Sequence, residues 1–173
     1  VKTGNALDAS GNVGVLIGAP DGKGTVGRFY EASKRIGFKV LLPIGLEKLI
    51  HSVKKAAETA NPENLIYSMG MPVSLLPIQG LTITECEAVN LLADLKATPI
   101  SSGGLSGAEG SATLFVEGNK ENTEKLLKIL KEVKGAKLPK IKNPKCEKCS
   151  WKTCFKYEAK NISSTRLMKN IDS

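Results

Sequence analysis

The sequence of 173 residues lacks any apolar run near the roughly 20 residues that a membrane-spanning helix needs. Its start also lacks the basic segment, apolar stretch and cleavage site of a secretory signal. We therefore expect a cytoplasmic protein with no membrane partner. Because thiols stay reduced in that compartment, clustered cysteines are expected to serve a metal or redox chemistry rather than structural disulfides.

Histidine is almost absent, which limits the catalytic sites that the chain can build. His51 is the only histidine, and we interpret it as a structural residue of a predicted helix. Without a second histidine, a His-rich catalytic zinc site is excluded. No G-x-S-x-G pattern supports a serine nucleophile. The sequence identifies no catalytic residue, and whether the chain is an enzyme stays open.

Acidic residues are scarce in the last third of the chain. Residues 119–173 hold 15 of the 25 Lys and Arg but only 6 of the 17 Asp and Glu, which leaves residues 1–118 close to neutral. This basic region is a candidate surface for nucleic acid, an acidic protein or an anionic small molecule. The alternative is a solvated helix face followed by a lysine-rich tail.

Apolar runs alternate with helical patterns in the first half of the chain. Residues 12–19, 38–44 and 64–69 are typical of buried strands, and the periodicity of 25–36 and 46–59 predicts helices. Short β–α–β units of this kind favour an α/β fold. The predicted architecture is a mostly parallel sheet covered by helices, a Rossmann-like three-layer arrangement with a C-terminal cysteine-rich extension.

The second half is less regular. Two prolines within residues 70–78 predict an irregular loop or an edge strand. The T-x-x-E spacing of Thr82 and Glu85 predicts a capping box that begins a helix reaching about residue 96. A short strand near 98–101, a strand over 112–117 and a helix over 121–134 follow. We expect residues 1–135 to form one α/β domain and 136–173 a basic, cysteine-containing extension.

A glycine-rich loop lies between the first predicted strand and helix. Backbone N–H groups at a helix N-terminus suit a phosphate, so the loop is a candidate site for a nucleotide or another phosphorylated ligand. It departs from the P-loop pattern, because it is one residue short and lacks the Ser or Thr after the lysine. A simple strand-to-helix turn is the alternative. The candidate residues are Gly18, Asp21, Gly22, Lys23, Gly24 and Thr25.

A second loop has four glycines within residues 102–110, among them Gly103 and Gly104. It is interpreted either as a mobile flap or anion nest of backbone N–H groups, or as a plain surface connection. If both glycine loops follow the carboxyl ends of strands in one sheet, they face the same crevice.

Three of the four cysteines, Cys146, Cys149 and Cys154, are spaced C-x2-C-x4-C. A C-x2-C pair lets two thiolates converge on one metal ion or cluster. Cys86 is a candidate fourth ligand, although a free cysteine among apolar neighbours is also a common core residue. Because only one C-x2-C pair is present, a [4Fe–4S] cluster is favoured over zinc. An unmetallated tail with a labile disulfide stays open.

Three functional interpretations remain. The first is a cofactor-handling protein with a cluster at the C-terminal cysteines and a phosphate-bearing ligand on the α/β body. The second is a nucleic-acid or protein-binding module whose basic tail is folded by zinc. The third is a nucleotide-dependent transferase with structural cysteines. The sequence indicates no oligomeric state.

Overall fold

The fold was established from a computed structural model that describes residues 1–19, 22–65, 68 and 71–137. The first sheet joins β1 (Ala6–Leu7), β2 (Val13–Ile17) and β4 (Ser74–Ile78) in the order β1-β2-β4, with both pairings antiparallel. The strand expected over 12–19 is therefore confirmed as β2. The interrupted segment 70–78 does hold an edge strand, and Pro77 lies within it.

Helix α1 (Gly24–Ile36) confirms the helix expected over 25–36, and it ends at Gly37, whose φ of +83° is in the left-handed region that favours glycine. It leads to β3 (Leu41–Pro43), which is shorter than the expected strand. β3 pairs in parallel with β5 (Leu81–Ile83), in a sheet separate from the first.

The single helix expected over 46–59 is divided. A 3-10 turn, η1 (Leu46–Lys48), comes first, and α2 (Val53–Thr59) follows. Between them, the Ile50 N–H donates to the Leu7 carbonyl at 2.7 Å. The Ser52 hydroxyl then caps α2 by accepting from the Lys55 N–H. These bonds to β1 and to the cap replace the helical bonds that a continuous helix would need.

The strand expected over 64–69 is not seen in the described residues of that segment. A second 3-10 turn, η2 (Pro62–Asn64), enters it, and Leu65 and Ser68 belong to no strand or helix. Residues 66, 67 and 69 lie outside the described part of the chain.

The C-terminal half begins with α3 (Glu85–Ala93) and continues through β6 (Lys96–Ser102), β7 (Ala112–Glu117) and α4 (Lys120–Val133). β6 and β7 form an antiparallel hairpin. The strands expected near 98–101 and over 112–117 and the helix over 121–134 are confirmed. The expected capping box is two residues early, since Thr84 and Glu87 form it.

The predicted Rossmann-like, mostly parallel sheet is wrong. Of the three sheets in the described residues, two are antiparallel and the third, which is parallel, contains only β3 and β5. The alternation from β2 through α1 to β3 is confirmed, but alternation does not decide which strand pairs with which. Here β2 pairs with β4, far along the chain, so α1 does not return the chain to the sheet that contains β2.

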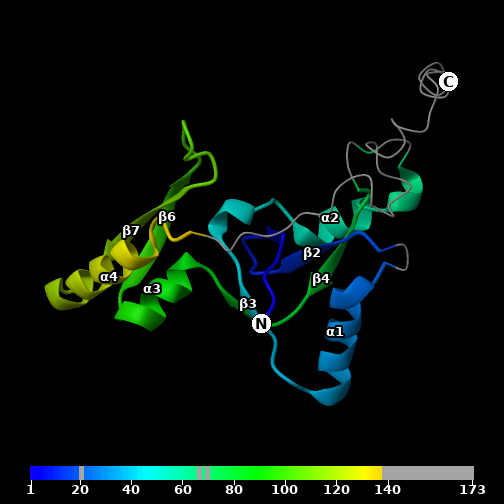
Figure 1. Cartoon of the computed structure of the whole chain (residues 1–173), viewed down its shortest axis with the longest axis horizontal. Helices are drawn as coiled ribbons and strands as arrows, with labels where there is room; N and C mark the ends of the chain where they lie inside the picture. Colours follow the sequence, from blue (N-terminus) through cyan, green and yellow to red (C-terminus); the bar gives the residue numbers. More distant parts are fainter. Residues whose placement is uncertain (20–21, 66–67, 69–70, 138–173) are drawn as a thin grey trace.

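Buried side chains gather in two lobes, which Figure 1 shows side by side. The N-terminal lobe (residues 1–83) packs β2, β3, β4 and α1 around one cluster, with a smaller cluster under α2. The C-terminal lobe (residues 84–135) packs α3 and α4 around Val89, Ala93, Leu95 and Leu126. None of the helices in the described part of the chain is long and apolar enough to cross a membrane.

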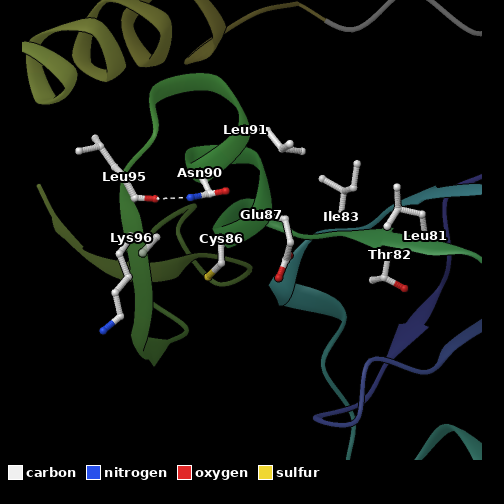
Figure 2. A pocket seen from close by; sticks show the side chains of 10 residues that line it. Leu81, Thr82, Ile83, Cys86, Glu87, Asn90, Leu91, Leu95 and Lys96 are labelled. Atoms are coloured by element: carbon white, nitrogen blue, oxygen red, sulfur yellow. Dashed lines mark hydrogen bonds between the residues drawn. The ribbon is translucent and has the colours of Figure 1, made fainter.

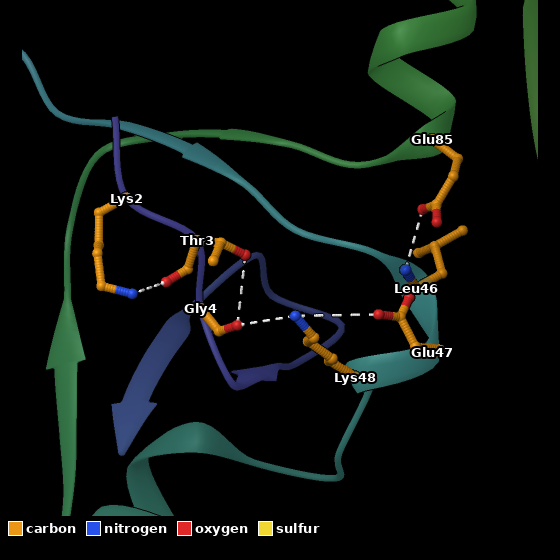
Figure 3. Close-up of polar contacts among 7 residues, drawn as sticks. All are labelled: Lys2, Thr3, Gly4, Leu46, Glu47, Lys48 and Glu85. Carbon is orange, nitrogen blue, oxygen red and sulfur yellow. Dashed lines mark hydrogen bonds and ion pairs between the residues drawn. The ribbon is translucent and has the colours of Figure 1, made fainter. Parts of the chain in front are cut away.

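A polar network ties the start of α3 to the N-terminal lobe (Figure 3). The Glu85 carboxylate accepts a hydrogen bond from the Leu46 N–H at 2.9 Å. In the same turn, the Lys48 ammonium donates to the Gly4 carbonyl at 3.1 Å, which ties η1 to the start of the chain. Together with the β3–β5 pairing, the Glu85 bond fixes where α3 leaves the N-terminal lobe.

Candidate functional site

The first glycine loop does lead into the N-terminus of α1. Lys23 is the N-cap residue and provides no side-chain cap, so Thr25 is the second residue of α1. Gly22 and Gly24 have φ values of +65° and +53°, a conformation that favours glycine. Asp21 lies outside the described residues, whereas Gly18 follows β2 and packs closely against the Met71 side chain.

Charge at the start of α1 is compatible with an anion. No acidic residue lies in its first turn, and a helix N-terminus carries a partial positive charge. The Lys23 ammonium pairs with Glu31 at 2.7 Å, and both side chains are exposed. Any phosphate held by Lys23 must therefore compete with this ion pair. Phosphate binding at this loop stays a prediction.

The second glycine loop connects β6 and β7 at the tip of the hairpin. The Gly103 N–H donates to the Ser111 carbonyl at 2.8 Å, and the Ser111 hydroxyl returns a bond to the Gly103 carbonyl at 2.9 Å. Gly104 packs against Ala108. The Glu109 carboxylate accepts from the Gly107 N–H at 2.9 Å. The chain's own carboxylate thus takes up a backbone donor that an external anion would use.

Backbone donors in this loop also stabilise the charged form of Glu109. Hydrogen bonds from the N–H groups of Glu109 and Gly107 lower the pKa of its carboxyl group. The two glycine loops do not meet the condition for a shared crevice, because β2 and β6 belong to different sheets. Figure 1 places the hairpin tip and the start of α1 on different lobes.

A concave surface beside the predicted site residue Cys86 lies where the two lobes join, and we call it the β5–α3 groove. It has a volume of about 480 Å³. Leu81, Thr82 and Ile83 of β5 form one wall, and α3 with the start of β6 forms the other (Figure 2). The α3 and β6 side is lined by Cys86, Glu87, Asn90, Leu91, Leu95, Lys96 and Ala97.

Most polar groups of the β5–α3 groove already have partners. The Glu87 carboxylate completes the capping box by accepting from the Thr84 N–H at 2.8 Å and from the Thr84 hydroxyl. The hydroxyl bond outweighs burial and lowers the pKa of Glu87. The Asn90 amide donates to the Leu95 carbonyl at 3.5 Å. The groove therefore presents an apolar wall beside an ionised carboxylate.

Cys86 sits in the first turn of α3 and is half-buried at this groove (Figure 2). Burial raises the pKa of its thiol, and the neighbouring carboxylates of Glu87 and Glu85 add to the effect. The thiol is therefore protonated at neutral pH, unlike a nucleophilic cysteine. Within the part of the chain that the structure describes, no group of three or more His, Cys, Asp or Glu side chains is arranged to hold a metal.

The three clustered cysteines, Cys146, Cys149 and Cys154, lie outside the described residues. The metal site, the basic surface for nucleic acid and the domain boundary at residue 135 therefore stay predictions. His51 is exposed and precedes the cap of α2.

Sequence reasoning missed one buried charge, Asp8, which is 6% exposed. Its carboxylate accepts a hydrogen bond at 3.0 Å from the N–H of Val53, the first residue of α2. It also accepts from the backbone N–H groups of Ser10 and Asn12. Burial alone would raise the pKa of Asp8, but these bonds lower it. The turn composition of Asp-Ala-Ser-Gly-Asn was the available signal. The role of Asp8 is structural.

Comparison with known proteins adds no family to these observations. No protein-family model, no curated protein and no solved structure matches the chain. The chemistry of its own residues is therefore the basis for a functional proposal.

Proposed function

We propose that this chain binds an iron–sulfur cluster through Cys146, Cys149 and Cys154. The observation that carries the proposal is their C-x2-C-x4-C spacing in the sequence. Two residues between cysteines allow both thiolates to reach one cluster, and the third cysteine is close enough in sequence to join them. Structural zinc sites usually take their ligands from two such pairs, and the chain has one.

Cys86 is the proposed fourth ligand. Its thiol is half-buried at the β5–α3 groove rather than enclosed in either hydrophobic core. The protonated thiol would lose its proton on coordination, because a metal stabilises the thiolate. This requirement makes cluster binding favour higher pH.

The test is the metal content of the full chain purified without oxygen. We expect iron with acid-labile sulfide and a broad visible absorption. One zinc per chain would overturn the cluster and leave a structural metal site. A protein with neither metal, after attempted reconstitution with iron and sulfide, would overturn the proposal.

Substitutions of individual cysteines identify the ligands of the proposed cluster. Cys149→Ser is expected to abolish the visible absorption, because two remaining clustered thiolates do not hold a cluster stably. Ser150→Ala is the matched control, since it alters the same segment and keeps every thiol. Cys86→Ser is expected to weaken cluster retention without abolishing it. Full retention in Cys86→Ser would assign the fourth position to another ligand.

A second candidate function is binding of a phosphate-bearing ligand at the start of α1. It is favoured by the absence of an acidic residue from the first turn and by Lys23 at the N-cap. Isothermal titration calorimetry with pyrophosphate tests this binding. Lys23→Ala should weaken binding several-fold, and Lys34→Ala, in the last turn of the same helix, should not. Equal effects would indicate nonspecific attraction to the basic chain.

A further inference from the structure

Several of the apolar side chains that line the β5–α3 groove are exposed to solvent. Leu81 is 65% exposed on β5, and Leu91 is 69% exposed on α3. Both line the groove, together with Ile83 and Leu95 (Figure 2). Contiguous apolar surface of this kind, next to an ionised carboxylate, is typical of a surface that another segment covers.

Helix α4 ends on the side of the C-terminal lobe where α3 leaves β5. The Asn122 amide, near the start of α4, donates to the Asp94 carbonyl at the end of α3 with a distance of 3.4 Å. Leu126 then packs in one cluster with Val89 and Ala93, so α4 runs back along α3. Figure 1 shows α4 ending on the side of the lobe where α3 begins. The described chain therefore leaves α4 on the side of the lobe where α3 begins.

Charge complements this placement. The groove lining itself holds one acid, Glu87, and one base, Lys96, whose ammonium lies 3.9 Å from the Glu117 carboxylate. Glu85 and Asp94, at the two ends of α3, add two further acidic side chains to that helix. Residues 138–157 contain six lysines and a single acidic residue. The same segment carries Trp151 and Phe155, the kind of side chain that fills an apolar groove. An apolar groove beside acidic residues thus has an apolar, basic segment attached nearby.

We propose that residues 138–157 dock in the β5–α3 groove of their own chain, with Trp151 against the apolar wall that includes Leu81 and Leu91. Trp151 follows Lys137 by 14 residues, a length that spans up to about 45 Å when extended. The whole of α4 is only about 20 Å long by its rise per residue. The reach is ample. This docking goes beyond cluster binding and needs no metal, although it brings the clustered cysteines towards Cys86.

Trp151 is the only tryptophan, so its fluorescence reports docking directly. The experiment uses the full chain with Cys146, Cys149 and Cys154 replaced by Ser, which removes the proposed cluster and its quenching. We expect blue-shifted emission and weak quenching by iodide. Leu91→Asp or Leu81→Asp in this background should shift the emission to the red and increase iodide quenching several-fold. Both positions are exposed, so the fold tolerates the change.

Leu127→Asp is the matched control, because Leu127 is half-exposed on α4 and does not line the groove. It should leave Trp151 emission unchanged. Emission typical of free tryptophan in the parent chain, or no response to either groove variant, would overturn docking. A red shift on dilution alone would assign the docked segment to a second copy of the chain and also overturn it.

The outcome is separable from the proposed function. Iron in the unsubstituted protein, with Trp151 indifferent to the groove variants, leaves cluster binding in place and removes docking. A groove-dependent Trp151 signal in a protein that holds no metal does the reverse.

Discussion

The two lobes bury apolar residues to different degrees. Among the described residues, the N-terminal lobe buries twelve apolar side chains and the C-terminal lobe four, while each exposes eight large apolar ones. In the C-terminal lobe, Val116 faces the helices and Phe115 is 57% exposed on the other side of the same strand. A two-stranded sheet with two helices has one covered face, so most of its apolar surface lacks a partner layer.

The two lobes therefore draw their stability from different contacts. The N-terminal lobe encloses its core between sheets and helices, as an independent fold does. The C-terminal lobe has a small core and an open sheet, so it depends more on caps, on its contacts with the N-terminal lobe and on the segment that we propose covers the β5–α3 groove.

The largest effect is expected from truncating the N-terminal core. Leu42 is 0% exposed, and Leu42→Ala should lower the free energy of unfolding by about 4 kcal/mol, since the enclosed site cannot collapse around the lost atoms. Leu126→Ala, the matched change in the C-terminal lobe, should cost about 2 kcal/mol because α4 can shift towards α3. Urea unfolding measures both. Equal costs would mean that the two cores are equally enclosed.

The next largest effect is expected for Asp8→Asn, which should lower the free energy of unfolding by about 2 kcal/mol at pH 7. The reason is that an amide cannot accept all the hydrogen bonds that converge on the carboxylate. The folded-state pKa of Asp8 is lowered from its ordinary value of 3.8. The stabilisation is therefore present above about pH 3.8 and lost as pH falls through the lowered pKa.

The free energies of unfolding of Asp8→Asn and of the parent protein, measured with urea, should therefore converge in acid. Asp94→Asn is the control in the other lobe, since Asp94 ends α3 with a φ of +53°, which Asn also adopts readily. A gap between Asp8→Asn and the parent that persists unchanged at pH 2 would contradict the assigned role of the carboxylate.

The smallest effect is expected at the capping box. Thr84→Ala removes the side-chain bond to the Cys86 N–H and the hydroxyl bond to Glu87, and it keeps the backbone bond to Glu87, at a cost of about 1 kcal/mol. Hydrogen exchange should show faster opening of α3 and unchanged protection of β2. Ser52→Ala, which removes the cap of α2 in the N-terminal lobe, is the comparison. Faster exchange throughout the chain in Thr84→Ala would show that the lobes open together.

Local signals in the sequence identified many elements, and non-local pairing was where they failed. β2, α1, β7 and α4 follow from periodicity and turn residues within the element itself. The T-x-x-E spacing occurs twice, at Thr82 and at Thr84. The second is used because Thr82 is held in β5, opposite Leu42. Likewise, the β2–β4 and β3–β5 pairings depend on contacts between residues dozens of positions apart, which periodicity does not encode.

The candidate site was predicted in part for the same reason. Cys86 was identified from its residue type, but the groove beside it is formed jointly by β5 and α3, and no local pattern describes it. In the second glycine loop, the glycines were evident, whereas the bond from the Gly107 N–H to Glu109 depends on the backbone path. The site on the clustered cysteines still rests on spacing alone.

The pairing of β3 with β5 has a mechanical consequence. β5 is separated from α3 by Thr84 alone, and it is held to β3 over three residue pairs in parallel. A force that pulls the C-terminal lobe away along the direction of β5 loads these bonds in shear, so that they share the load instead of opening one by one. Under tension, this short sheet would act as a clasp, and the lobes would separate in a single rupture.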